Sequence, residues 1–241
     1  MKQLFYAIVP GIVLVTSLLP QGNSALAQQI DKVDAEFAVQ VNNKNAHGKN
    51  ILNIQQDDGD YRINFALEHR LFSFNQEAHF RSGSDCQVTP TDYKETTRRA
   101  FGGKKDTQTL TFDWDHKVAH YQKDDKDKEF SLDSKVYDPI SFFFEARCAL
   151  MQGDKALAFP LIRKGDKKTQ QYRVTGTEVV NTPLGDFEAL VVERQRKSKK
   201  RQTRLYVAPE LGYLLVKIEH RENRLLSVTA TLDKMDYQFI N

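Results

Sequence analysis

The chain contains none of the short motifs that identify the common enzyme and cofactor-binding families. A nucleophile elbow, a zinc-protease helix, a phosphate-binding glycine loop and a Cys-x-x-Cys pair are all missing from the sequence. Charge of one dominant sign is missing as well, because 35 Lys and Arg residues are balanced by 32 Asp and Glu residues. A net charge this small gives no overall attraction to nucleic acid or to a membrane. The sequence therefore predicts no cofactor and no nucleic-acid partner.

Long apolar runs are missing after residue 19. The apolar stretch over residues 4–19 follows the basic Lys2 and precedes Ala25-Leu26-Ala27, which is the layout of a secretory signal. This stretch is about four residues shorter than the roughly 20 that a membrane-spanning helix needs. An uncleaved membrane anchor is the competing interpretation. We predict a signal peptide over residues 1–27, cut after Ala27, and an exported mature protein that does not span a membrane.

Cysteine is scarce, with only Cys86 and Cys148 in the chain. An even pair in an exported protein predicts a disulfide, and two independent thiols are the alternative. A bridge across so long a loop would stabilise the fold by about 2–4 kcal/mol.

The feature that dominates the remaining sequence is an alternation of apolar and polar residues with a period of two, which is typical of half-buried strands. It recurs in the segments 33–41, 61–67, 72–80, 110–114 and 187–191. Turn sequences such as Asp58-Gly59 separate these segments and favour hairpins. Residues 28–241 are therefore predicted to form a single, mainly β domain. Its antiparallel curved sheet of about a dozen strands would form a barrel or a half-barrel.

One segment breaks the alternation. Asp138 can cap a helix, Pro139 suits the first helical position, and Gly153 suits a helix end. The sequence predicts one helix over about residues 138–153, which would lid or plug the concave side of the sheet.

Three further segments carry a family resemblance. They resemble segments of the domain of unknown function 3108 family. The three are residues 137–141 (YDPIS) followed by Arg147, residues 182–187 (TPLGDF) and residues 205–214 (LYVAPELGYL). The resemblance implies an exported bacterial, periplasmic β protein with no established activity. In layout, that family is similar to curved-sheet carriers of lipids and lipoproteins in the envelope.

The predicted helix supplies the candidate ligand-binding residues, Arg147, Phe143 and Phe144. In the structural interpretation, Arg147 pairs with a carboxylate on the sheet, such as Glu77 or Glu193, and the phenylalanines belong to the core. In the functional interpretation, Arg147 binds a ligand inside the concavity and the rings form its wall.

A run of basic residues lies between two predicted strands over residues 194–204, and we call it the basic hairpin. It is predicted to be a solvated hairpin tip, or to contact an anionic partner such as phospholipid headgroups or acidic glycolipid. Its candidate residues are Arg196, Lys197, Lys199, Lys200 and Arg201.

The nearest approach to a metal site is the group Asp113, Asp115, His116 and His120. Its composition is also that of an ordinary solvated hairpin, and we predict no metal site there.

Three hypotheses for the function remain. The first is a non-enzymatic periplasmic binding or carrier protein, with a lipid or another apolar or amphipathic envelope molecule in the sheet's concavity. The second is an envelope scaffold that acts through a strand edge or the basic hairpin. The third is a hydrolase with an unrecognised site, which a histidine and an acid facing one cavity would favour.

Overall fold

The computed structural model describes residues 29–240 except 47, 49, 70, 71, 84, 100–104 and 199. The predicted signal peptide and Lys199 therefore lie outside the described residues. The described part of the chain is mainly β, as predicted, with fifteen strands in one antiparallel sheet, one α-helix and one 3-10 turn. No helix in this part is long and apolar enough to cross a membrane.

The elements follow one another with short connections. In chain order they are β1 (Ile30–Val41), β2 (Lys44–Ala46), β3 (Asn50–Asp57), β4 (Asp60–His69), β5 (Phe72–Ser82), β6 (Val88–Arg99), β7 (Asp106–Asp113), β8 (Val118–Lys123), β9 (Lys126–Ser131), α1 (Phe142–Met151), β10 (Ala156–Arg163), β11 (Asp166–Thr182), β12 (Gly185–Gln195), β13 (Gln202–Ala208), η1 (Pro209–Leu211), β14 (Leu214–Arg221) and β15 (Ser227–Phe239).

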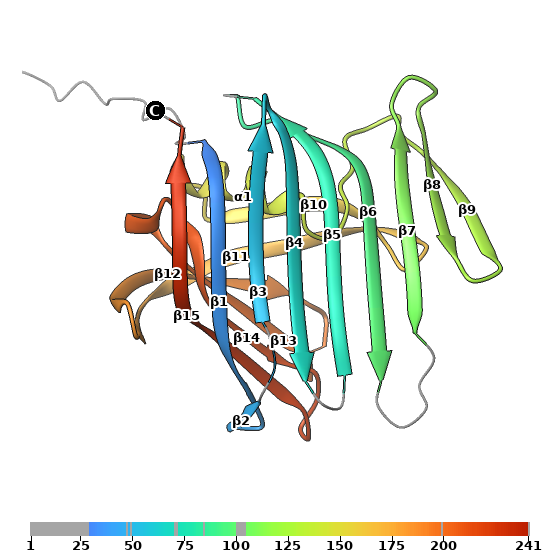
Figure 1. Cartoon of the computed structure of the whole chain (residues 1–241). Coiled ribbons are helices and arrows are strands. Elements are labelled where there is room, and N and C mark those ends of the chain that lie inside the picture. Colours follow the sequence, from blue (N-terminus) through green and yellow to red (C-terminus); the bar gives the residue numbers. More distant parts are fainter. Residues whose placement is uncertain are drawn as a thin grey trace, which may run out of the picture.

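The sheet is curved but not closed. Its strands pair in the order β10-β11-β12-β13-β14-β15-β1-β3-β4-β5-β6-β7-β8-β9, with β2 paired to β1. The strands β9 and β10 are therefore the two edges, and the pairing of β1 with β15 joins the two halves of the chain. Figure 1 shows the sheet curling round so that β10 and β11 pass behind β4–β6, with α1 on the enclosed side. The prediction of a barrel or half-barrel is confirmed in its open form.

The period-two alternation places one face of each strand in the core. In β1, for example, Val33, Ala35 and Phe37 are at most 4% exposed, whereas the residues between them are partly or fully exposed. The predicted hairpin at Asp58-Gly59 forms between β3 and β4, and both residues have positive φ angles, of 48° and 82°. Two such residues give the turn the twist that antiparallel strands need.

The helix begins later than predicted, at Phe142 rather than Asp138. The Asp138 carboxylate accepts the backbone N–H groups of Ile140 and Ser141, both at 2.8 Å. The next backbone bonds, from Phe143 to Ile140 and from Phe144 to Ser141, span three residues rather than four. Asp138 therefore caps a tight turn, and the α-helix starts only after that turn.

The end of the helix agrees better with the prediction. The last helical residue is Met151, and Gly153 follows with a φ of +91°. A residue with positive φ just after a helix ends it, and glycine adopts that conformation without strain.

The helix contacts both halves of the sheet. The Phe144 ring lies edge-on to Tyr61 of β4 and Phe80 of β5, with ring centres 4.8 and 4.7 Å apart. On the other side, the Phe142 ring packs against Phe159 of β10 at 5.2 Å. The helix therefore holds two distant parts of the sheet at a fixed separation, as a plug at one end of the concavity.

A disulfide fastens the helix to the sheet. Cys86, in the connection between β5 and β6, is bonded to Cys148 of α1, with the two Cα atoms 6.1 Å apart. The predicted pairing of the two cysteines is therefore present in the structure.

The two sheet edges meet through side chains. Lys128 of β9 donates to the Gly165 carbonyl at 2.8 Å, and Lys167 of β11 donates to the Ser131 carbonyl at 3.1 Å. Gly165 has a φ of +71°, and a Cβ atom there would lie 3.0 Å from the Tyr121 ring. The β10–β11 turn therefore needs glycine to approach β8 and β9 this closely.

Candidate functional site

The curved sheet and α1 enclose a cavity of about 1320 Å³. Much of its wall is apolar, with side chains from both halves of the sheet and from the helix segment. The apolar lining includes Leu52, Ile63, Phe65, Leu67, Phe72, Phe74, Ile140, Phe142, Phe143, Leu205, Leu215, Ile218, Leu226 and Val228.

Polar side chains form a row across the inner face of β5, β6 and β7. Gln76, Glu95 and Gln108 occupy paired positions on these three strands, and all three are buried. Glu95 Oε2 accepts hydrogen bonds from Gln76 Nε2 at 3.0 Å and from the Tyr93 hydroxyl at 2.9 Å. Burial raises the pKa of Tyr93 well above its usual value, and the neighbouring Glu95 charge adds to the shift. Tyr93 therefore stays protonated and donates to Glu95.

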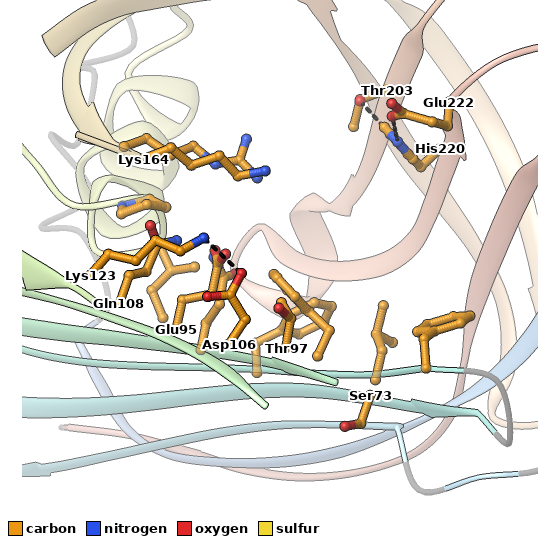
Figure 2. A pocket seen from close by; sticks show the side chains of 18 of the residues that line it. Ser73, Glu95, Thr97, Asp106, Gln108, Lys123, Lys164, Thr203, His220 and Glu222 are labelled. Carbon is orange, nitrogen blue, oxygen red and sulfur yellow. Dashed lines mark hydrogen bonds and ion pairs between the residues drawn. The ribbon is translucent and has the colours of Figure 1, made fainter. Parts of the chain in front are cut away.

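A second polar group lies on β13, on β14 and at the residue that follows β14. Figure 2 shows Thr203, His220 and Glu222 on one side of the cavity, with Glu95 and Gln108 on the other. The Thr203 hydroxyl lies 2.9 Å from His220 Nδ1, and His220 Nε2 lies 3.1 Å from the Glu222 carboxylate.

The charge of the imidazole follows from its surroundings. Burial lowers the pKa of His220 below its usual 6.5, although the Glu222 carboxylate opposes that shift. His220 is therefore neutral at neutral pH. Its Nε2–H then donates to Glu222, and its Nδ1 accepts the proton of the Thr203 hydroxyl.

The predicted ligand-binding residues separate into two places. Phe143 lines the cavity, whereas Phe144 is buried between Tyr61 and Phe80. Arg147 is 2% exposed and does not line the cavity.

Arg147 contacts the 3-10 turn and the last strand. Its Nε donates to the Gly212 carbonyl, and its guanidinium lies 5.5 Å from the centre of the Phe239 ring. Of the carboxylates considered as its partners, Glu193 instead pairs with Arg204, and Glu77 accepts a hydrogen bond from Asn75.

The basic hairpin connects β12 to β13. Lys197 and Lys200 are exposed, as expected of a solvated turn. Arg201 instead pairs with Glu222, and Arg196 lines the cavity. The expectation that the whole hairpin projects into water is therefore wrong for Arg196, because this residue directly follows β12 and lines the cavity together with Arg194.

The alternation of the strands carried a signal that the motif search missed. Gln76, Glu95 and Gln108 stand at inward positions where apolar residues would continue the core. His220 of β14 and Glu222, which directly follows that strand, line the cavity in the same alternation. A polar residue at an inward position of a strand marks a lined cavity or a buried polar network.

The group considered for metal binding has a local role instead. The Asp113 carboxylate accepts the backbone N–H of His116 at 2.9 Å and lies 2.8 Å from its Nδ1. Within the described part of the chain, no three His, Cys, Asp or Glu side chains are placed to hold a metal ion.

These observations define the structural class of the protein. It is an open, barrel-like antiparallel sheet around a cavity that a helix closes at one end. The chain belongs to the DUF3108 family of proteins of unknown function, whose model matches residues 36–231. No curated protein matches the chain.

Solved structures similar to the chain include the following two. One is a β-barrel-like protein of the domain of unknown function DUF1849 from Brucella abortus, with a TM-score of 0.58 at 9% identity, covering 87% of this chain and 99% of that one. The other is a putative lipoprotein from Parabacteroides distasonis, with a TM-score of 0.31 at 11% identity, covering 88% and 98%. The first likeness supports the fold alone.

Proposed function

We propose that the protein binds an apolar or amphipathic molecule of the bacterial envelope in the cavity between the curved sheet and α1, and carries or holds it there without changing it. The observation that carries this proposal is the cavity itself, with its volume of about 1320 Å³ and its largely apolar wall. Ligand pockets in proteins commonly measure about 300–1,000 Å³, so a lipid-sized molecule fits this one.

The way the walls are held apart also supports a binding role. Phe142 and Phe144 contact opposite parts of the sheet, and the disulfide at Cys148 fixes the helix that carries them. A cavity held open in this way needs little rearrangement before a ligand enters, which favours affinity. A filled barrel would instead have favoured an envelope scaffold.

The proposal includes the export of the chain. Residues 1–27 would be a signal peptide cut after Ala27, and residues 28–241 a single periplasmic β domain. The disulfide between Cys86 and Cys148 supports an oxidising compartment.

A neutral fluorescent probe tests the proposal. N-phenyl-1-naphthylamine becomes bright in apolar surroundings, and we expect it to bind the purified protein. Thr97 lies on β6 and lines the cavity (Figure 2), so Thr97→Trp should narrow the space and weaken the signal. Lys94→Trp adds the same ring to an exposed position of the same strand and should leave binding unchanged.

Mass spectrometry of an organic-solvent extract provides the second measurement. Protein isolated from the periplasm should contain a lipid or another amphipathic molecule, and the Thr97→Trp variant should contain less of it. If the wild-type protein is reproducibly empty and does not bind the dye, the proposal is refuted.

The hydrogen-bonded group Thr203, His220 and Glu222 favours a second candidate, a hydrolase. A neutral imidazole that accepts a hydroxyl proton is the arrangement of a nucleophile and its general base. Release of p-nitrophenol from p-nitrophenyl octanoate, with one octanoyl group added to Thr203, would support this candidate. The p-nitrophenol release and the octanoyl adduct should both disappear in the Thr203→Val variant. Both should persist in the Thr169→Val variant, which changes an exposed residue of β11. No release by the wild-type protein would discard it.

A further inference from the structure

Three arginines gather at one part of the cavity wall. Arg163 ends β10, Arg194 is the penultimate residue of β12, and Arg196 follows that strand; all three line the cavity. Burial lowers the pKa of Arg194 to about 10, and the positive charges of Arg196 and Arg163 add to that shift. The charge of Arg163 acts on both Arg194 and Arg196, so the three cations lie near one another on this part of the wall. We call this group the arginine site.

The arginine site has no carboxylate of its own. Among the residues that the structure describes, none of its three side chains forms an ion pair or a hydrogen bond with another side chain. The Nε atoms of Arg163 and Arg196 are buried without a hydrogen-bond partner. A buried polar group without a partner destabilises the protein unless something else supplies an acceptor.

Glu222 lines the cavity and its charge acts on Arg196, but its carboxylate already has other partners. Burial alone would raise the pKa of Glu222, but its contacts with His220 and Arg201 lower this pKa below its usual value. The segment 123–128, also in the lining, carries three lysines and three aspartates and so has no net charge. The other charged lining residues also balance in number, because Arg98 and Lys164 are matched by Glu95 and Asp106. Within the described cavity wall, the excess positive charge therefore belongs to the arginine site.

Apolar rings adjoin the arginine site. Tyr172 of β11 is paired in register with Arg194, and its ring stacks on Phe142 of α1 with the centres 5.6 Å apart. Arg163 and Arg196 both act electrostatically on the Tyr172 hydroxyl. The charged surface of the arginine site therefore lies directly beside the apolar surface formed by these rings.

We propose that the arginine site binds the anionic headgroup of an amphiphile, a carboxylate or a phosphate, while its hydrocarbon chain lies along the apolar wall beyond Phe142 and Phe143. This inference rests on the proposed function and narrows its ligand to one chemical class. The planar guanidinium group binds both anions through paired N–H donors, and such charge-assisted bonds are about twice as strong as neutral ones. A bound anion would also relieve the mutual repulsion of the three arginines.

Calorimetry with ligands of one chain length separates headgroup from chain. Decanoate, decyl phosphate and decanol share the same hydrocarbon chain, and each is titrated into the full mature protein below its critical micelle concentration. We expect the two anions to bind about tenfold or more tightly than decanol, since each charge-assisted hydrogen bond contributes that much. Their affinity should fall as salt is raised, whereas that of decanol should not.

Matched variants locate the site. Arg196→Gln and Arg194→Gln should each remove most of the difference between decyl phosphate and decanol. Lys197→Gln removes an exposed charge from the same loop and should leave that difference intact. Binding of N-phenyl-1-naphthylamine by every variant reports that the cavity is still folded.

Three results would overturn the inference. If decanol binds as tightly as the anions while the dye still binds, the headgroup is not recognised, although the proposed function stands. If inorganic phosphate weakens decyl phosphate binding at equal concentration, the arginines form a site for small anions and not for amphiphiles. If neither the dye nor any decyl ligand binds, the proposed function fails as well.

Discussion

Removal of the disulfide should lower the free energy of unfolding by an amount that depends on the length of the loop that the bridge closes. Cys86 and Cys148 are 62 residues apart, so the bridge closes a loop that includes β6–β9 and most of α1. In the unfolded chain, closing a loop of this length costs conformational entropy worth about 4 kcal/mol at 25 °C. We therefore expect the Cys86→Ser, Cys148→Ser double variant to lose about 4 kcal/mol of unfolding free energy. For a domain of this size, that loss corresponds to a fall in Tm of about 8–16 °C.

Urea denaturation followed by tryptophan and tyrosine fluorescence measures the loss. The wild-type protein in reductant should unfold at the same midpoint as the double variant, and reductant should not affect the variant. Mass analysis of the wild-type protein before and after reduction should differ by two hydrogens. Equal urea midpoints for oxidised wild type and double variant would refute the reasoning, because the bridge would then not restrict the unfolded chain.

Three further predictions concern individual side chains. Phe144→Ala should destabilise the fold by about 3–5 kcal/mol in urea titrations, and the same change at the less buried Phe143 should cost less. Gly212→Ala should lower the urea midpoint, because Gly212 has a φ of +60° and its added Cβ would lie 2.7 Å from the Phe239 ring. The NMR titration midpoint of His220 should lie below 6.5, since burial lowers its pKa. The unfolded chain then binds more protons, so stability is lost as pH falls below 6.5, and His220→Gln should reduce that loss.

The fold could be predicted from the sequence because the alternation is a local property. In β1, the side chains of Val33, Ala35 and Phe37 point inward whichever strands are its neighbours. Local chemistry also marked the helix, but its first turn was misplaced. Asp138 looks the same in a sequence whether it caps an α-helix or the tight turn before one, and only the hydrogen bonds distinguish the two.

The candidate site was largely hidden because it depends on curvature. Arg163 ends β10 and Arg196, 33 positions later, directly follows β12; both line one cavity because β10, β11 and β12 pair side by side in the curved sheet. The sequence drew attention to the basic hairpin for its charge density. It could not show that the residues on the β12 side of that hairpin face the cavity, whereas Lys197 and Lys200 face water.

The polar residues at inward positions explain why a chain able to build an apolar core leaves a cavity beside it. Near α1, the inward positions hold rings that pack to full contact, such as Phe80 against Phe144. Farther along the same strands, Gln76 and Glu95 hydrogen-bond to each other, and a strand that turns such groups inward cannot be covered by hydrocarbon without loss. The two walls therefore stay apart where the polar row begins. A molecule with both a hydrocarbon chain and a polar end is the kind of ligand that satisfies such a surface.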